Sequence, residues 1–333
     1  MLPFHLTPQL KKTLSRLEAE GATEQLASIC AQVFPSDKES IITAGELTDP
    51  LGEHCHRITD RLVHQYKNRV LLLSTGRCFA YCRHCFRRDF AGRGEQWLSK
   101  TELDEVCKYI SLHEEIEEIL ISGGDPLTVS DNELEYLFTR LREVNPRLLF
   151  RICTRALFFA PERFTPSLIH LLKNYKPLWL IPHINHPAEI SRKFAPETSD
   201  ALESLVNAGI PVQSQTVLLK GVNDDVSILH ELFHELVCLG VKPGYLFQLD
   251  LAQGTSHFRV PLEEALHLYE LLRKELSGLS TPVFAVDLPD GGGKFNLIQL
   301  GRNVCDTEVT LTEKEFIFTR NGQGGGQWKY PRN

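Results

Sequence analysis

The chain has 333 residues, of which 42% are hydrophobic and 24% charged, the proportions of an ordinary soluble globular protein. A formal net charge of −7, with no long basic runs, argues against nucleic acid as a partner. No segment approaches the ~18 consecutive apolar residues that span a bilayer, and the first residues lack the pattern of a signal peptide, so we expect a cytoplasmic protein with no membrane partner.

From Arg69 onward, β-branched or leucine-rich runs alternate with amphipathic stretches of helical length. Strands are predicted at residues 69–75, 117–122, 148–154, 178–184, 211–219, 245–251 and 282–288. Ser99 and Ser130, each with an acid three residues later, predict helix N-caps, and Gly209 and Gly240 predict helix ends. Strands separated by helices predict βαβ units and a parallel sheet, in an open α/β barrel or a doubly wound sheet.

Three segments follow from this pattern. Residues 1–68 are expected to be a largely helical N-terminal extension without a large core of its own, and residues 69–300 a barrel that holds the site. Residues 301–333 are expected to form a short hairpin and a loose, glycine-rich tail.

Unusual polar residues follow the predicted strands where each ends. Cys78 follows the first strand, residues 123–125 the second, His183 lies at the end of the fourth, and Asp250 and Asp287 lie near the ends of the last two. In parallel α/β folds the carboxyl ends of the strands carry the chemistry, so these positions predict one central active site.

Three cysteines, Cys78, Cys82 and Cys85, lie on one short loop with the spacing C-x3-C-x2-C. Structural disulfides are not expected in a reducing compartment, and zinc sites usually take four ligands. Three thiolates match three corners of a [4Fe–4S] cluster and leave the fourth iron open for a ligand that reacts. A zinc knuckle that borrows His84 is the alternative.

This spacing after a first strand resembles the motif of radical S-adenosylmethionine enzymes, and "SGGDP" (Ser122 to Pro126) resembles their second element. The resemblance implies a partial (β/α)6-type barrel, with S-adenosylmethionine beside the cluster. Gly123 and Gly124 would let backbone approach the methionyl part of this ligand, and Asp125 would accept from its amine.

Further stretches resemble the lysine 2,3-aminomutase family between about Leu51 and Gln299. They are "NRVLLLSTGRC", "YCRHCFRRDFAG", "ISGGDPL", "HINHPAEI", "QTVLLKGVND", "QLDLAQGTSHFR" and "VDLPDGGGK". The family is a group of isomerases that exchange the α-amino group of L-lysine with a hydrogen on C3, giving β-lysine, and use pyridoxal 5′-phosphate as well as the cluster.

The resemblance also implies roles for single residues. Lys294, which follows three glycines, would form the Schiff base with pyridoxal phosphate, and Arg69 would bind its phosphate. The positions that match the family's S-adenosylmethionine pocket are His84, His183 and Gln215.

Recognition of lysine needs opposite charges at its two ends. The resemblance implies that Arg87 binds the carboxylate and that Asp250 and Asp287 together bind the distal ammonium. An aminomutase for glutamate is a further alternative, but neutral or basic residues would then be expected in place of the two aspartates.

Other expectations concern partners and roles. The family implies an electron donor such as a flavodoxin or ferredoxin. Long members carry a C-terminal extension with further cysteines that serves oligomer contacts, and this chain lacks it, so its oligomeric state stays open and a homodimer is possible. An enzyme that isomerises lysine for attachment to elongation factor P is the alternative role, and a non-catalytic iron–sulfur protein is the alternative class.

Overall fold

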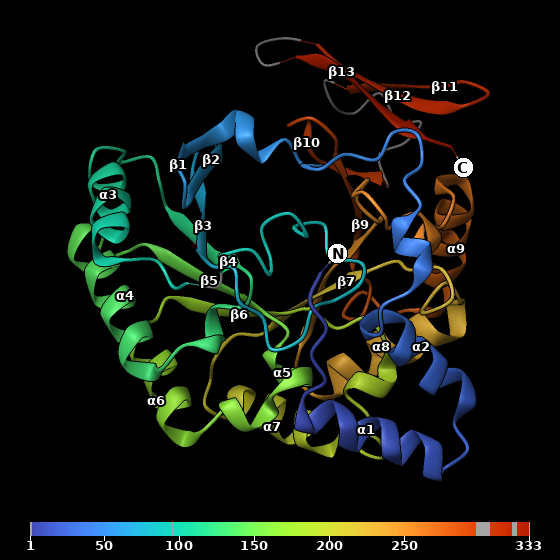
Figure 1. Ribbon diagram of the computed structural model, residues 1–333, viewed down its shortest axis with the longest axis horizontal. Helices are drawn as coiled ribbons and strands as arrows, with labels where there is room; N and C mark the ends of the chain where they lie inside the picture. The colour runs from blue at the N-terminus through green and yellow to red at the C-terminus, as the bar shows by residue number, and fades with distance from the viewer. Residues whose placement is uncertain (1, 95, 298–306, 322–324, 333) are drawn as a thin grey trace.

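The computed structural model describes residues 2–94, 96–297, 307–321 and 325–332. Its centre is a curved wall of parallel strands, seen face-on in Figure 1. The strands are β3 (Arg69–Thr75), β4 (Glu118–Gly123), β5 (Leu149–Thr154), β6 (Leu178–Pro182), β7 (Gln213–Val217), β8 (Lys242–Phe247) and β9 (Val283–Leu288). Two parallel bridges, Leu180 to Val212 and His183 to Gln215, join β6 to β7, so the wall continues across both sheets.

The wall does not close into a complete barrel. On one edge, β1 (Arg57–Thr59) and β2 (Leu62–Tyr66) add to β3 in antiparallel fashion, and on the other β10 (Gly293–Asn296) adds to β9. No backbone pairing joins these two edges within the described ranges. The fold is therefore the partial barrel predicted from the sequence.

Amphipathic helices cover the outside of the wall (Figure 1). They are α3 (Lys100–Ser111), α4 (Asp131–Val144), α5 (Ala156–Phe159), α6 (Pro166–Asn174), α7 (Pro196–Asn207), α8 (Val226–Cys238) and α9 (Leu262–Glu275). Ser99 and Ser130 form the predicted capping boxes, and Gly209 and Gly240 end α7 and α8 with φ of 71° and 75°. None of the helices in the described part of the chain is long and apolar enough to cross a bilayer.

The N-terminal helices, α1 (Pro8–Ala19) and α2 (Thr23–Val33), pack on the barrel through a small apolar cluster shared with α5. The expectation of a largely helical segment before Arg69 is wrong for β1 and β2, which extend the sheet. Short 3-10 turns lie in the connections: η1 (Asp37–Ser40), η2 (Glu53–His56), η3 (Pro126–Thr128), η4 (Pro161–Arg163), η5 (Pro187–Glu189) and η6 (Ser256–Phe258).

The C-terminal segment forms an antiparallel sheet of β11 (Thr307–Leu311), β12 (Glu315–Arg320) and β13 (Gly326–Pro331). The loose tail that we predicted is wrong, because Tyr330 in β13 is fully buried and its hydroxyl donates to the Leu249 carbonyl at 2.7 Å. Of the segment expected to hold a hairpin, residues 301–306 lie outside the described residues.

One strand is displaced from its predicted position. Strand β8 spans Lys242–Phe247, whereas the sequence predicted residues 245–251. Pro243 and Gly244 have the composition of a turn, but at Gly244 a Cβ would lie 2.6 Å from the Gln213 side chain of β7, so the position favours glycine within the sheet. After Phe247 the chain leaves the sheet and carries Asp250 over the end of the barrel.

Candidate active site

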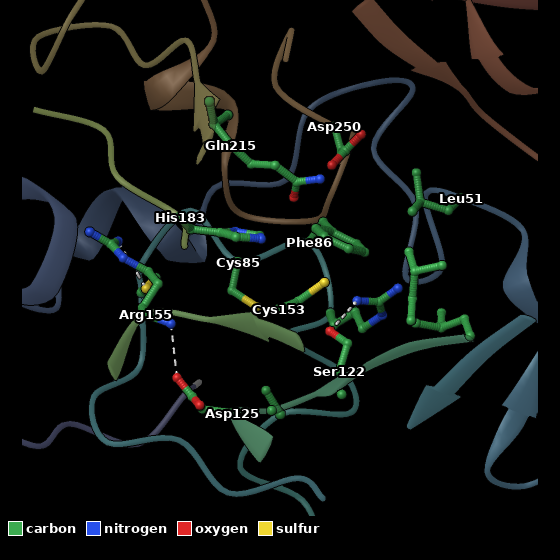
Figure 2. A pocket seen from close by; sticks show the side chains of 18 of the residues that line it. Leu51, Cys85, Phe86, Ser122, Asp125, Cys153, Arg155, His183, Gln215 and Asp250 are labelled. Atoms are coloured by element: carbon green, nitrogen blue, oxygen red, sulfur yellow. Dashed lines mark hydrogen bonds between the residues drawn. The ribbon is translucent and has the colours of Figure 1, made fainter. Parts of the chain in front are cut away.

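A cavity of about 390 Å³ lies inside the partial barrel and at the carboxyl ends of its strands. Every site residue predicted from the sequence lines it, from the three cysteines to Lys294. The others are Arg69, His84, Arg87, Gly123, Gly124, Asp125, His183, Gln215, Asp250 and Asp287. Figure 2 shows Cys85, His183, Gln215 and Asp250 entering the same space from different segments.

The segment after β4 is fastened to the start of the cysteine loop. The backbone N–H of Gly124 donates to the Thr75 carbonyl at 2.5 Å, and that of Asp125 donates to the Arg77 carbonyl at 2.7 Å. A Cβ on Gly124 would lie 2.2 Å from the Arg77 oxygen, and Gly123 has φ of 107°. Packing against the cysteine loop therefore requires both glycines, whether or not they also approach a ligand.

The carboxylate of Asp125 is occupied within the protein. It accepts hydrogen bonds from the Thr154 hydroxyl at 2.9 Å, from the Arg155 backbone at 2.9 Å and from the Leu127 backbone at 3.1 Å, and its burial raises its pKa. These contacts tie the end of β4 to the end of β5. They favour a scaffolding role over the predicted contact with a ligand amine.

Arg155 follows the third predicted strand and lies beside the cysteines, although the sequence predicted no role for it. Its Nη1 donates to Cys82 Sγ at 3.1 Å and its Nη2 donates to Glu189 at 2.7 Å, and Glu189 is fully buried. Burial raises the pKa of the Cys85 thiol to about 11. The charges of Arg87 and Arg88 act in the opposite direction on Cys85, and Arg155 places a buried positive charge beside Cys82.

Two buried histidines complete this end of the cavity. Burial lowers the pKa of His183 to about 4 and that of His84 well below its usual range, with nearby Arg155 adding to both effects. Both rings are therefore neutral at pH 7. His84 Nδ1 and His183 Nε2 have no hydrogen-bond partner among the described residues, which fits a polar ligand such as S-adenosylmethionine at the cysteine end.

At the opposite end, Lys294 on β10 faces Asp287 on β9, its partner in the strand register. Its Nζ lies 3.0 and 2.9 Å from the two carboxylate oxygens of Asp287. The ring centroids of Phe247 and Tyr245 on β8 lie 3.9 and 5.2 Å from the same nitrogen. The sequence predicted no role for Tyr245 or Phe247. Their spacing was a usable signal, because alternate residues of the strand that leads to Asp250 point to one face.

Asp250 lines the same end of the cavity. Burial, and then the neighbouring Asp287 carboxylate, raise the pKa of Asp250 to about 8, whereas the charges of Lys294 and Arg87 act in the opposite direction. A nearby cation therefore favours ionisation of Asp250 beside Asp287.

Arg87 has a partner that the sequence did not reveal. Its guanidinium forms an ion pair with Glu53, through Nε at 3.2 Å and through Nη2, and its Nη1 lies 3.4 Å from the Ser122 hydroxyl. Both side chains are mostly buried, with exposed fractions of 14% and 12%. No periodic pattern marks Glu53, which sits in the short turn η2.

The guanidinium of Arg69 is placed to bind an anion in the cavity. Its guanidinium lies over the Tyr66 ring, 3.9 Å from the centroid, and makes no hydrogen bond or ion pair with another described residue. The Tyr66 hydroxyl accepts the backbone N–H of Lys294 at 2.9 Å. An arginine without an acidic partner and a lysine thus border one cavity, which fits the phosphate and the aldehyde of pyridoxal phosphate.

Within the described ranges, no three His, Cys, Asp or Glu side chains converge closely enough to hold a single metal ion. The zinc knuckle with His84 would need such a group. A [4Fe–4S] cluster makes a different demand, because each cysteine binds a separate iron.

Comparison with known proteins identifies the family to which the chain belongs. Residues 72–232 match the model of the radical SAM superfamily. A Treponema pallidum protein provisionally named L-lysine 2,3-aminomutase is 49% identical over 331 residues, which cover 99% of this chain and 90% of that protein. The chain belongs to the lysine 2,3-aminomutase family.

Two further relatives are longer than this chain, and they differ from each other in the substrate that their names give. The L-lysine 2,3-aminomutase of Fusobacterium nucleatum is 41% identical over 79% of this chain, and the chain spans 61% of that protein's length. The glutamate 2,3-aminomutase of Clostridioides difficile is 38% identical over 75% of this chain and 58% of its own length. The chain is thus an isomerase of a family that uses a [4Fe–4S] cluster, S-adenosylmethionine and pyridoxal phosphate, and the family includes more than one substrate.

Proposed function

We propose that the chain is a lysine 2,3-aminomutase that converts L-lysine to β-lysine. The observation that carries the proposal is the acidic end of the cavity, where Asp287 binds the Lys294 ammonium and Asp250 lies close enough to be affected by both charges. Two carboxylates at this place suit the distal ammonium of lysine and would repel the distal carboxylate of glutamate.

Each recognition residue has a task in this proposal. Arg87, held by Glu53 on one edge, offers its remaining N–H groups to the substrate carboxylate. Asp250 and Asp287 hold the distal ammonium, so the substrate lies across the cavity with its reacting carbons between the two ends. The barrel wall excludes water from these carbons.

The cofactors supply the chemistry that side chains lack: the cluster with S-adenosylmethionine supplies a carbon radical that removes hydrogen, and pyridoxal phosphate carries the migrating nitrogen. Cys78, Cys82 and Cys85 would hold the cluster, and His84, His183 and Gln215 border the space for S-adenosylmethionine. Lys294 and Arg69 would hold pyridoxal phosphate at its aldehyde and its phosphate.

The test is an anaerobic assay of the iron-reconstituted chain with both cofactors, dithionite and either L-lysine deuterated at C3 or L-glutamate. We expect β-lysine, detected by mass spectrometry, with deuterium appearing in 5′-deoxyadenosine, and no β-glutamate. Conversion of glutamate in preference to lysine would overturn the proposal. Provision of β-lysine for elongation factor P would use the same reaction, so this assay tests the step that both roles share.

A further inference from the structure

The amine of Lys294 fills a slot shaped for an alkylammonium. One wall of the slot is the Asp287 carboxylate, whose two oxygens lie 3.0 and 2.9 Å from Nζ. A second wall is aromatic, with the Phe247 and Tyr245 ring centroids on the neighbouring strand β8 at 3.9 and 5.2 Å from Nζ. A carboxylate and two ring faces around one nitrogen form a strong cation site.

Asp250 makes the slot depend on its cation. The Asp287 charge raises the pKa of Asp250 and the Lys294 charge lowers it, so the ammonium offsets the repulsion between the two acids. Without a cation, ionisation of Asp250 beside Asp287 would place two negative charges in a buried site, which is costly.

The substrate's distal ammonium needs the same slot. Lys294 and the substrate carry the same chemical group, a primary ammonium on a flexible alkyl stem. Two such cations cannot share this space, because each would lose its carboxylate contacts and repel the other.

We propose that Lys294 masks the ammonium site while the enzyme lacks pyridoxal phosphate, and that attachment of the cofactor to Lys294 unmasks it. Pyridoxal phosphate would then have to bind before lysine is recognised. This inference rests on the proposed function, because it takes Asp250 and Asp287 as the partners of the substrate ammonium.

The chemistry of attachment supports the exchange. Nζ forms a double bond to the aldehyde carbon of pyridoxal phosphate, the aldehyde oxygen leaves as water, and two of the three ammonium hydrogens go into that water. Nζ then has at most one N–H and can no longer donate to both oxygens of Asp287. The backbone of Lys294 stays fixed, since its N–H donates to the Tyr66 hydroxyl at 2.9 Å and β10 stays paired with β9, so only the side chain has to move.

The test compares ligand binding to the full chain, with cluster and S-adenosylmethionine but without pyridoxal phosphate. The probes are 6-aminohexanoate, which keeps both ends of lysine but lacks the α-amine, and hexanoate, which also lacks the ammonium. By calorimetry we expect Lys294→Met to bind 6-aminohexanoate about tenfold more tightly than the wild type. Lys294→Arg, which keeps a cation, should bind like the wild type, and hexanoate should not distinguish the three proteins.

A second neutral variant, Lys294→Gln, guards against an effect peculiar to methionine, and adding Asp287→Asn to Lys294→Met should abolish the gain. Equal affinity of wild type, Lys294→Met and Lys294→Gln for 6-aminohexanoate, together with preference for it over hexanoate, would overturn masking and leave the proposed function standing. Failure of every protein to prefer 6-aminohexanoate over hexanoate would overturn both.

Discussion

The two ends of the cavity differ in which of their buried polar atoms lack a hydrogen-bond partner within the described chain. At the cysteine end, His84 Nδ1, His183 Nε2 and Arg155 Nε have no hydrogen-bond partner among the described residues. The charged groups are paired within the chain throughout the cavity: Lys294 with Asp287 at the lysine end, Arg155 with Glu189 at the cysteine end, and Arg87, two residues after Cys85, with Glu53.

The difference follows from the cost of each kind of group. A buried neutral donor or acceptor without a partner costs about 1–3 kcal/mol, which a fold can tolerate until a ligand arrives. An unpaired buried charge costs several times more, so the chain supplies a counter-charge of its own. The uncharged histidine atoms at the cysteine end can therefore stay without a partner until a ligand binds, whereas the Lys294 ammonium is paired within the chain and has to be displaced before another cation can take its place.

The largest effect is expected from removing one of the cysteines that would hold the cluster. In Cys82→Ala, a cluster would lose one of its three thiolates, and we expect iron content and absorbance near 400 nm to fall to near background, with loss of S-adenosylmethionine cleavage. Cys238→Ala, which removes an exposed cysteine on α8, is the matched control and should keep its cluster. Normal iron content in Cys82→Ala would mean that the loop does not hold the cluster.

A smaller change at the same end should shift the reduction potential of the cluster without removing the cluster. Arg155 places positive charge on Cys82, and Glu189 partly cancels that charge. Glu189→Gln should therefore raise the reduction potential, and the double change Arg155→Gln with Glu189→Gln should lower it, each on the order of tens of millivolts. The double variant avoids leaving Glu189 buried without a partner.

The measurement is a redox titration followed by electron paramagnetic resonance. Shifts of the same sign in both variants would contradict the view that Arg155 acts through its charge on Cys82. Unchanged potentials would mean that Arg155 only supports packing.

Sequence patterns predicted the barrel and the residues that line its cavity, because both predictions depend on local features of the sequence. Strand runs are short and apolar, and the carboxyl ends of parallel strands meet at one edge, so residues such as Cys78 and Asp287 converge wherever the strands pair. Their chemical roles came from resemblance to a family, since spacing alone left a zinc site open. Those roles stay predictions.

Long-range packing explains what the sequence missed. Glu53 reaches Arg87 because Gly52, with φ of 63°, lies so close to the β9–β10 turn that a Cβ would be 2.3 Å from the Gly291 nitrogen. Nothing local to η2 signals this approach. In the C-terminal tail the glycine content suggested a loose end, but Trp328 and Tyr330 lie on the same face of β13, with Tyr330 in the main hydrophobic core and Trp328 packed against it.

The smallest expected effect concerns stability at the lysine end and tests whether burial and the neighbouring Asp287 raise the pKa of Asp250. The pKa of Asp250 is raised from an ordinary value near 4 to about 8, so between these limits the folded chain keeps a proton that the unfolded chain releases. The stability due to this proton is therefore lost as the pH rises through this window, with no further change above about 8. In protein without pyridoxal phosphate, Asp250→Asn removes this dependence and should be more stable than the wild type by on the order of 1–2 kcal/mol at pH 8.5, with little difference near pH 5.

Urea unfolding from pH 5 to 9 measures this difference, and Asp200→Asn, at an exposed position on α7, is the matched control that should follow the wild type. A constant offset between Asp250→Asn and the wild type would contradict the raised pKa. The negative charge at the lysine end would then be balanced by Lys294 alone, and Asp250 would not have a raised pKa. A gap that widens with pH would instead show that the chain gives up stability to keep two carboxylates where a cation must bind.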